Sequence, residues 1–133
     1  MKIKEVLAQK SSNAVFAIEA SKSIDVVIKE MHEKRVGALL VQSETGEPIG
    51  ILTDQDIVRF YAEQLGDANQ VSVAQIMTEN FCVETLDSTT DKAESIMTEQ
   101  RVRHLPIVDD CEVIGIISLG DLVKAKLQET AVE

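Results

Sequence analysis

The chain has 133 residues, enough for one compact domain or for two small half-domains that share a core. Its content of 44% hydrophobic and 27% charged residues is that of an ordinary globular protein, but aromatic residues make up only 3%, which argues against the base-stacking surfaces of single-stranded nucleic acid binders. The net charge of -10 repels nucleic acid and anionic membranes, so any anionic ligand needs a local basic cluster.

The chain carries no recognisable targeting or membrane segment. No apolar run at its start resembles a signal peptide, and no stretch approaches the roughly 18 apolar residues of a membrane span. Cys82 and Cys111 form no CxxC pair, so we expect reduced thiols in a cytoplasmic protein, with a disulfide between the two as the alternative. Neither nucleic acid nor a membrane is an expected partner.

An internal repeat decides the expected architecture. Residues 15–37 align with residues 81–103 at a constant offset of 66. After a loop that is one residue shorter in the second copy, residues 50–58 align with residues 115–123 at an offset of 65. The sequence therefore predicts two copies of one structural unit.

The first copy predicts, in chain order, a short helix, a strand, a second helix, two strands joined by a polar turn, and a third helix. Apolar residues recur at helical spacing in the helices and run continuously in the buried strands. Ser23 is expected to cap the second helix and Thr53 to open the third. Gly46 and Pro48 mark the turn. The expected limits are 4–9 for the first helix and 15–18, 38–41 and 49–52 for the strands.

The second copy repeats this order, beginning with a helix over residues 74–79. Equivalent apolar positions are occupied by Val83, Ala93, Met97, Leu105, Ile107, Ile114, Ile116, Ile117 and Leu122. Each half is too small to bury both faces of its own sheet, so we expect an α/β (α+β) fold in which two β-α-β-β-α repeats pack about a pseudo-two-fold axis. The expected domains are 1–66, the first repeat with the N-terminal helix, and 67–133, the second repeat with its leading helix.

A motif of the form Gly-Ile-x-[Thr/Ser]-x-x-Asp occurs in both copies where a strand meets a helix. It ends in Thr53 and Asp56 in the first copy and in Ser118 and Asp121 in the second. One interpretation is a capping box, in which the hydroxyl and the carboxylate only stabilise the helix start. The other is ligand binding, since a carboxylate at such a junction accepts two hydrogen bonds from a ribose diol.

The duplicated unit, the paired motif and the stretch RHLPIVD of the second copy resemble the CBS domain family, named for cystathionine beta-synthase. The resemblance covers about 115 residues of the chain. It implies two clefts that hold AMP, ADP or ATP, and less often S-adenosylmethionine or an NAD-type ligand. It also implies that the ribose binds to Thr53 and Asp56 in one cleft and to Ser118 and Asp121 in the other.

The resemblance places phosphate contacts at Arg103 and His104, within the segment RVRHLP, although a solvated turn is the alternative. The first copy has Gly37 and Ala38 at these positions, so the two clefts should be unequal. Lys10, just before the first strand, is a further candidate cation. The candidates for adenine contact, or otherwise plain core, are Phe16, Ile51, Val83 and Ile116.

Catalysis finds little support in the sequence. The two histidines, His32 and His104, fit no Ser/His/Asp or Cys/His arrangement, and with the two cysteines they are too scattered to bind zinc. We expect no catalytic residue, no metal and no catalytic cofactor.

We therefore expect a regulatory module that binds an adenine nucleotide and senses the cellular energy state. The alternatives are a ligand-free module that dimerises or docks onto a partner, and an enzyme with an unfamiliar site. The resemblance also implies a homodimer that associates through the helices carrying Val27, Met31, Ala93 and Met97, and a downstream protein that the sequence does not name.

Overall fold

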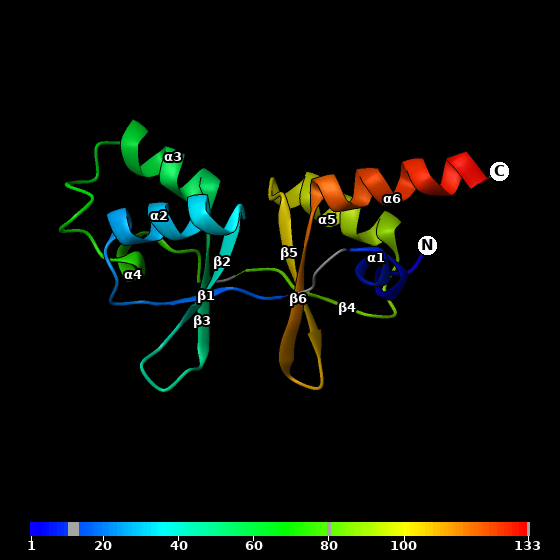
Figure 1. The fold of residues 1–133 in the computed structure, drawn as a ribbon, viewed down its shortest axis with the longest axis horizontal. Coiled ribbons are helices and arrows are strands. Elements are labelled where there is room, and N and C mark those ends of the chain that lie inside the picture. Colours follow the sequence, from blue (N-terminus) through cyan, green and yellow to red (C-terminus); the bar gives the residue numbers. More distant parts are fainter. Residues whose placement is uncertain (11–13, 80, 133) are drawn as a thin grey trace. The chain divides into compact units, whose positions relative to one another are not determined.

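The computed structural model describes residues 1–10, 14–79 and 81–132 (Figure 1). Over these residues the fold is α/β, as expected, with two three-stranded sheets and six helices. In chain order the elements are α1 (Ile3–Gln9), β1 (Ala17–Glu19), α2 (Ile24–Lys34), β2 (Ala38–Gln42), β3 (Pro48–Thr53), α3 (Asp54–Ala62), α4 (Val73–Ile76), β4 (Glu84–Thr85), α5 (Thr90–Gln100), β5 (His104–Asp109), β6 (Glu112–Ser118) and α6 (Leu119–Val132).

The two sheets share one topology, which confirms the predicted β-α-β-β-α repeat. In each, a short first strand pairs in parallel with the middle strand, and the middle strand pairs antiparallel with the last. Both middle strands carry a register shift at matching positions, after Val41 and after Ile107. The helices before these strands end alike, at Arg35 and Arg101, both in the left-handed conformation. The duplication in sequence is therefore a duplication of backbone geometry.

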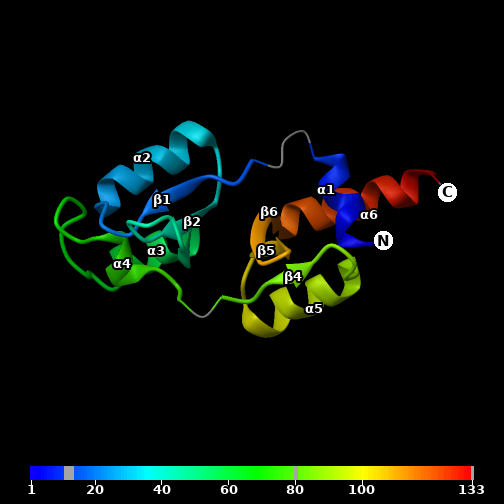
Figure 2. The same ribbon diagram turned by 90° about the horizontal axis from the view of Figure 1, so that it is seen from below.

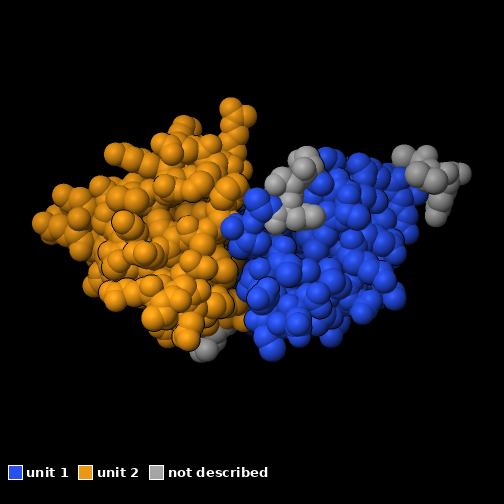
Figure 3. Space-filling view, turned by 60° about the horizontal axis from the view of Figure 1, so that its bottom comes forward, with its two compact units in different colours: residues 1–15, 82–133 blue, residues 16–81 orange. Residues whose placement is uncertain are grey.

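The chain forms two compact units, coloured separately in Figure 3. The first-repeat unit is Phe16–Phe81, and the second-repeat unit combines Met1–Val15 with Cys82–Glu133. These packing units are not the sequence repeats, for which 1–66 and 67–133 stay the prediction, because each leading helix packs in the unit of the other repeat. Helix α4 packs in the first-repeat unit, and α1 packs in the second-repeat unit, where it lies beside α6 (Figure 2).

Backbone hydrogen bonds explain the exchange. The first N–H groups of a helix have no partner within it and need acceptors elsewhere. Those of Ile3 and Lys4 donate to carbonyls of Ser88 and Leu86, at 2.9 and 3.0 Å. In the same way, the start of α4 donates from Val73 to Lys22 and from Ala74 to Ala20, at 2.8 and 3.0 Å. Each leading helix is thereby tied to the sheet-to-helix loop of its packing unit.

The glycine of the repeated motif admits the end of the leading helix. A Cβ atom at Gly50 would lie 2.7 Å from the sulfur of Met77, and one at Gly115 would lie 3.0 Å from a methyl carbon of Leu7. A Cβ atom at either position would require the neighbouring side chain to shift, so glycine suits this packing. The glycine thus lets the end of each leading helix lie close to the strand.

Each unit buries its own apolar core. The side chains that the homodimer prediction assigned to a subunit interface, those of Val27, Met31, Ala93 and Met97, lie in these cores and are at most 8% exposed. The apolar side chains on which that prediction depended are therefore already buried in the cores of the chain itself. The first core contains Ile18, Ile24, Val27, Met31, Leu39, Val41, Leu52, Phe60, Val73 and Ile76; the second contains Ile3, Val6, Leu7, Ala93, Met97, Leu105, Ile107, Ile117, Leu122 and Ala125.

Candidate functional site

The repeated motif forms a reciprocal capping box in both units, which confirms the capping interpretation. The Thr53 amide donates to Oδ2 of Asp56 at 2.9 Å, and the Asp56 amide donates to the Thr53 hydroxyl at 3.4 Å. The Ser118 amide donates to Oδ2 of Asp121 at 2.9 Å, and the Asp121 amide donates to the Ser118 hydroxyl at 3.1 Å. Both carboxylates also lie at helix N-termini, where the helix dipole favours negative charge. Capping alone therefore does not distinguish the two repeats.

The two carboxylates differ in their other partners. Asp56 is buried, with its side chain only 11% exposed, and it receives donors of its own unit on both oxygens. The Thr53 hydroxyl donates to Oδ2 at 3.3 Å, while the Thr78 hydroxyl, at 3.5 Å, and Arg59, at 3.8 Å, face Oδ1. Burial raises the pKa of Asp56, and the hydrogen bond from the Thr53 backbone and the charge of Arg59 oppose that rise.

Asp121 is paired with a lysine from α1's C-terminal cap. The Lys10 ammonium lies 3.1 Å from Oδ2 of Asp121 and donates to the carbonyl of Ile116 at 2.8 Å. Both side chains of this ion pair are about one quarter exposed, at 24% and 25%. The structure therefore brings Lys10, a predicted phosphate residue, directly to a predicted ribose residue.

A hollow of about 620 Å³ lies at the start of α6 in the second-repeat unit. It is lined by Arg103, His104 and Ser118, so predicted phosphate and ribose residues share one surface. Two backbone features bring them together: the Leu119 amide donates to the Arg103 carbonyl at 2.8 Å, and His104 is the register partner of Ser118 between β5 and β6. Sites for small molecules and cofactors usually measure about 300–1,000 Å³.

Arg103 supplies the hollow with an exposed cation. Over the described ranges its guanidinium has neither an ion pair nor a hydrogen bond, whereas its carbonyl is held by α6. The equivalent positions of the first repeat, Gly37 and Ala38, carry no charge, as the sequence predicted. The two repeats are therefore unequal in the positive charge they present.

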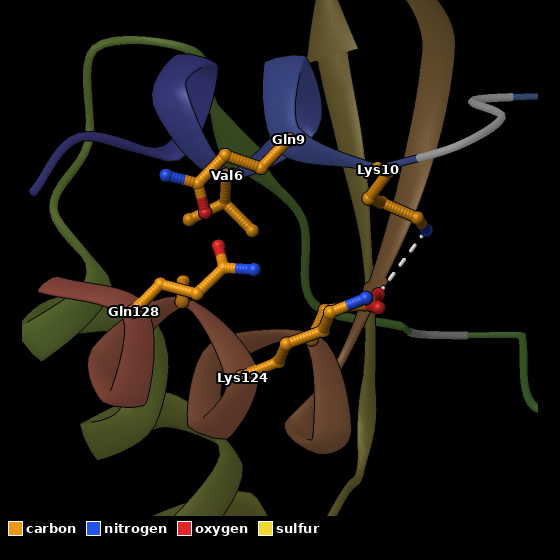
Figure 4. Close-up of a pocket in the computed structure, with 7 residues that line it drawn as sticks. Val6, Gln9, Lys10, Lys124 and Gln128 are labelled. Carbon is orange, nitrogen blue, oxygen red and sulfur yellow. Dashed lines mark ion pairs between the residues drawn. The ribbon is translucent and has the colours of Figure 1, made fainter. Parts of the chain in front are cut away.

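A second, smaller pocket of about 100 Å³ separates α1 from α6 (Figure 4). Gln9 and Gln128 point toward each other across it, and Lys10 and Lys124 point toward its other end, where the ion pair with Asp121 is drawn. Its volume is below the usual range for cofactor sites, so it holds a small group at most.

The sequence interpretation missed Lys124 and the apolar wall of the larger hollow. Lys124 lines both the hollow and the pocket, and it follows Asp121 by three residues, the spacing that puts two side chains on one helix face. The apolar wall consists of Leu119, Val123 and Leu127, which are 41–67% exposed. Their spacing of four residues was the available signal, because it places them on one face of an exposed helix.

The four adenine candidates line neither the hollow nor the pocket. Phe16 is half-buried against the first core, with the Lys34 ammonium 5.2 Å from its ring centre, and Ile51 is buried in β3. In the other unit, Val83 is 43% exposed just before β4, and Ile116 is half-buried in β6. Ile51 is a core residue, which was the stated alternative, whereas Val83 is too exposed for the core, and adenine contact stays a prediction for all four.

The remaining features concern metal, cysteines and membranes. No group of three or more His, Cys, Asp or Glu side chains suited to a metal occurs among residues 1–10, 14–79 and 81–132. Cys82 is half-buried and Cys111 is exposed, and neither is in a disulfide. Within the same ranges, no helix has both the length and the apolar content needed to cross a membrane.

Comparison with known proteins identifies the family. The CBS domain family matches the chain twice, over residues 3–63 and 73–128. The chain belongs to the CBS domain family. Because the matches cover both repeats, the protein is a tandem CBS module, a class that is generally regulatory and ligand-binding.

Individual relatives agree with this assignment. The mitochondrial CBS domain-containing protein CBSX3 of Arabidopsis thaliana is 35% identical over 77% of this chain, which spans only 52% of that protein. The CBS domain-containing protein YhcV of Bacillus subtilis is 32% identical over 81% of this chain and 76% of its own length. A solved structure of a putative signal-transduction protein with CBS domains from Burkholderia ambifaria superposes with a TM-score of 0.90, at 33% identity over 96% of this chain and 95% of the other.

Proposed function

We propose that this chain is a regulatory module that binds an adenine nucleotide, AMP, ADP or ATP, in its second repeat. The observation that carries the proposal is that Arg103 and Ser118 line one hollow of about 620 Å³. Its occupancy would follow the cellular adenylate level and report it to a protein partner. NAD and S-adenosylmethionine are weaker candidates, the latter because a basic cluster repels its sulfonium charge.

Charge supports the second repeat as the site. A chain of net charge -10 repels phosphate unless cations gather locally, and the second repeat has Arg103 and His104 at the edge of the hollow. The first repeat has Gly37 and Ala38 at these positions. Hydrogen bonds to phosphate from an ionised donor are among the stronger ones in proteins.

Burial supports the same choice. Asp56 is engaged on both oxygens by Thr53, Thr78 and Arg59 and is only 8% exposed, so a ribose would have to displace those donors. Asp121 is more exposed. In the second repeat the apolar residues of α6 at the hollow offer a face on which a purine ring would lose contact with water.

Calorimetric titration of the purified protein against adenosine, AMP, ADP, ATP, GTP, NAD and S-adenosylmethionine tests the proposal. We expect binding of the adenine nucleotides, tighter than that of GTP or adenosine. A parallel thermal-shift series should show a rise in melting temperature with the same compounds, because they bind only the folded state. If no adenine compound produces heat at millimolar concentration, the proposal is wrong.

A ligand-free interaction module is the second candidate, and one observation favours it. Both capping boxes are complete within the protein, so Asp56 and Asp121 already have a structural role. Under this proposal, every nucleotide would leave the melting temperature unchanged.

We further propose a cytoplasmic homodimer with reduced cysteines, since proteins with paired CBS domains often oligomerise. Light scattering at micromolar concentration should then give about twice the chain mass of 14.6 kDa. A mass equal to that of one chain would contradict the dimer and leave nucleotide binding untouched.

A further inference from the structure

Lys124 is positioned to contact a ligand in either cavity of the second-repeat unit, the hollow or the smaller pocket. It lies in the second turn of α6 and lines the large hollow together with Arg103, His104 and Ser118. It also lines the small pocket, where its side chain points toward the same end as that of Lys10 (Figure 4). Among the residues that the structure describes, no other lines both cavities.

The aligned residue of the first repeat, Arg59, shows what a cation at this position does when it is structural. Arg59 donates to the carbonyl of Ile76 at 2.9 Å and lies within 4 Å of carboxylate oxygens of Asp56 and Glu63. Lys124 has no such partner in the part of the chain that the structure describes. An ammonium without a protein acceptor beside a hollow is available to an anionic ligand.

We propose that Lys124 binds the second or third phosphate of the ligand and makes the site selective for ADP and ATP over AMP. This inference rests on the proposed function and adds a preference for nucleotides with two or three phosphates. Arg103 is fixed through its backbone beside Ser118, close to where the ribose would lie, so it serves the phosphate next to the sugar. Among the described residues, Lys124 is the second cation on the hollow, besides Arg103, whose charged group is not tied to a protein group.

Charge matching gives the direction of selectivity. Each added phosphate brings at least one more negative charge toward a chain of net charge -10, so binding ATP is unfavourable unless a cation meets each added charge. With Lys124 present, the second phosphate gains an ionic hydrogen bond. Without it, the same phosphate meets only repulsion, while AMP is unaffected.

The experiment compares Lys124→Gln with Lys126→Gln, a control on the same helix that removes the same charge but lines neither hollow. Dissociation constants are measured by calorimetry for adenosine, AMP, ADP, ATP and tripolyphosphate at fixed ionic strength. We expect Lys124→Gln to weaken ADP and ATP about tenfold and AMP less than twofold, with adenosine unchanged. Lys124→Arg, which keeps the charge, should retain most of the ATP affinity.

Several outcomes would overturn the proposal. An equal loss for AMP and ATP, or the same loss in Lys126→Gln, would show that Lys124 acts through structure or general charge. Unchanged affinities in Lys124→Gln, with a wild-type protein that binds AMP, would refute this inference alone. Tripolyphosphate binding that depends on Lys124, with no binding of any adenine compound, would support the cation and refute the adenine site.

Discussion

The two strand-to-helix junctions carry the same capping box but place it in different surroundings. In the first-repeat unit Asp56 is buried and both of its oxygens face donors of the protein, whereas in the second-repeat unit Asp121 is partly exposed beside Lys10. The motif alone therefore specifies a helix start. Its neighbours decide whether the carboxylate is also available for a ligand.

The difference arises from a few substitutions on one scaffold. Gly37 and Ala38 stand where the second repeat has Arg103 and His104, and Arg59, which is tied to the protein, stands where the second repeat has Lys124. Since the backbone is duplicated, these side chains carry the difference in charge between the two repeats.

The largest effect is expected from Leu7→Ala, which tests the exchange of leading helices. Leu7 is buried in the second core although it lies at the start of the chain. The substitution should lower the free energy of unfolding by about 2–5 kcal/mol and reduce amide hydrogen-exchange protection mainly in residues 82–129.

Met77→Ala is the matched control, because Met77 occupies the equivalent place under Gly50 of the first-repeat unit. Its loss of protection should fall in residues 16–79 instead. If Leu7→Ala instead loosens the first-repeat unit, the exchange described here does not hold in solution.

A smaller effect, on affinity, is expected from Arg103→Ala. If Arg103 contacts phosphate, AMP and ATP should bind about 1.5–3 kcal/mol more weakly, while adenosine keeps its affinity. Arg101→Ala removes the same charge two residues earlier, at the exposed end of α5, and should change little. Equal losses for adenosine and AMP would indicate that Arg103 supports the fold rather than the ligand.

The smallest effect is a pH dependence specific to Asp56. Burial raises its folded pKa above the ordinary value of 3.8, so folding favours the protonated form. That contribution is fully present below the unfolded pKa and is lost as pH rises through the folded pKa. The stability of the wild type relative to Asp56→Asn should therefore rise as pH falls through this interval, as measured by urea unfolding.

Asp25 provides a control of opposite sign in the same unit. The hydroxyl of Ser23 donates to it and lowers its pKa, so its contribution is present above the unfolded pKa and is lost as pH falls. The difference between wild type and Asp25→Asn should shrink with acid. If the stability differences between the wild type and each of the two variants, Asp56→Asn and Asp25→Asn, changed with pH in the same direction, the burial assigned to Asp56 would be contradicted.

Much of the fold could be predicted because local patterns determine it. The offsets of 66 and 65 residues identified the repeat, and apolar runs located the buried strands. The helix expected over 74–79 ends at Ile76, since Thr78 instead pairs with Ile51 in extended conformation. The exchange of leading helices was not predictable, because a short amphipathic helix shows its apolar face but not which sheet will bury it.

The candidate site was only partly predictable, because a local sequence pattern does not show which residues will be neighbours in the folded chain. Of the predicted residues, Ser118, Arg103 and His104 line the hollow, whereas Asp121 lines the smaller pocket instead. Adenine contact was assigned to strand residues by resemblance, whereas the apolar wall of the hollow lies on α6. Which cations are already paired, as with Arg59, depends on tertiary neighbours that no local pattern reveals.

Calorimetric titration of ATP into Asp121→Asn and Asp56→Asn decides whether the second repeat, and not the first, binds the nucleotide. Each substitution keeps the side-chain size and removes one charge from one capping box. We predict that Asp121→Asn weakens ATP by roughly 1.5–3 kcal/mol, tenfold or more, whereas Asp56→Asn stays within about twofold of the wild type. Equal effects in the two variants, or a loss confined to Asp56→Asn, would show that the second repeat is not the preferred site.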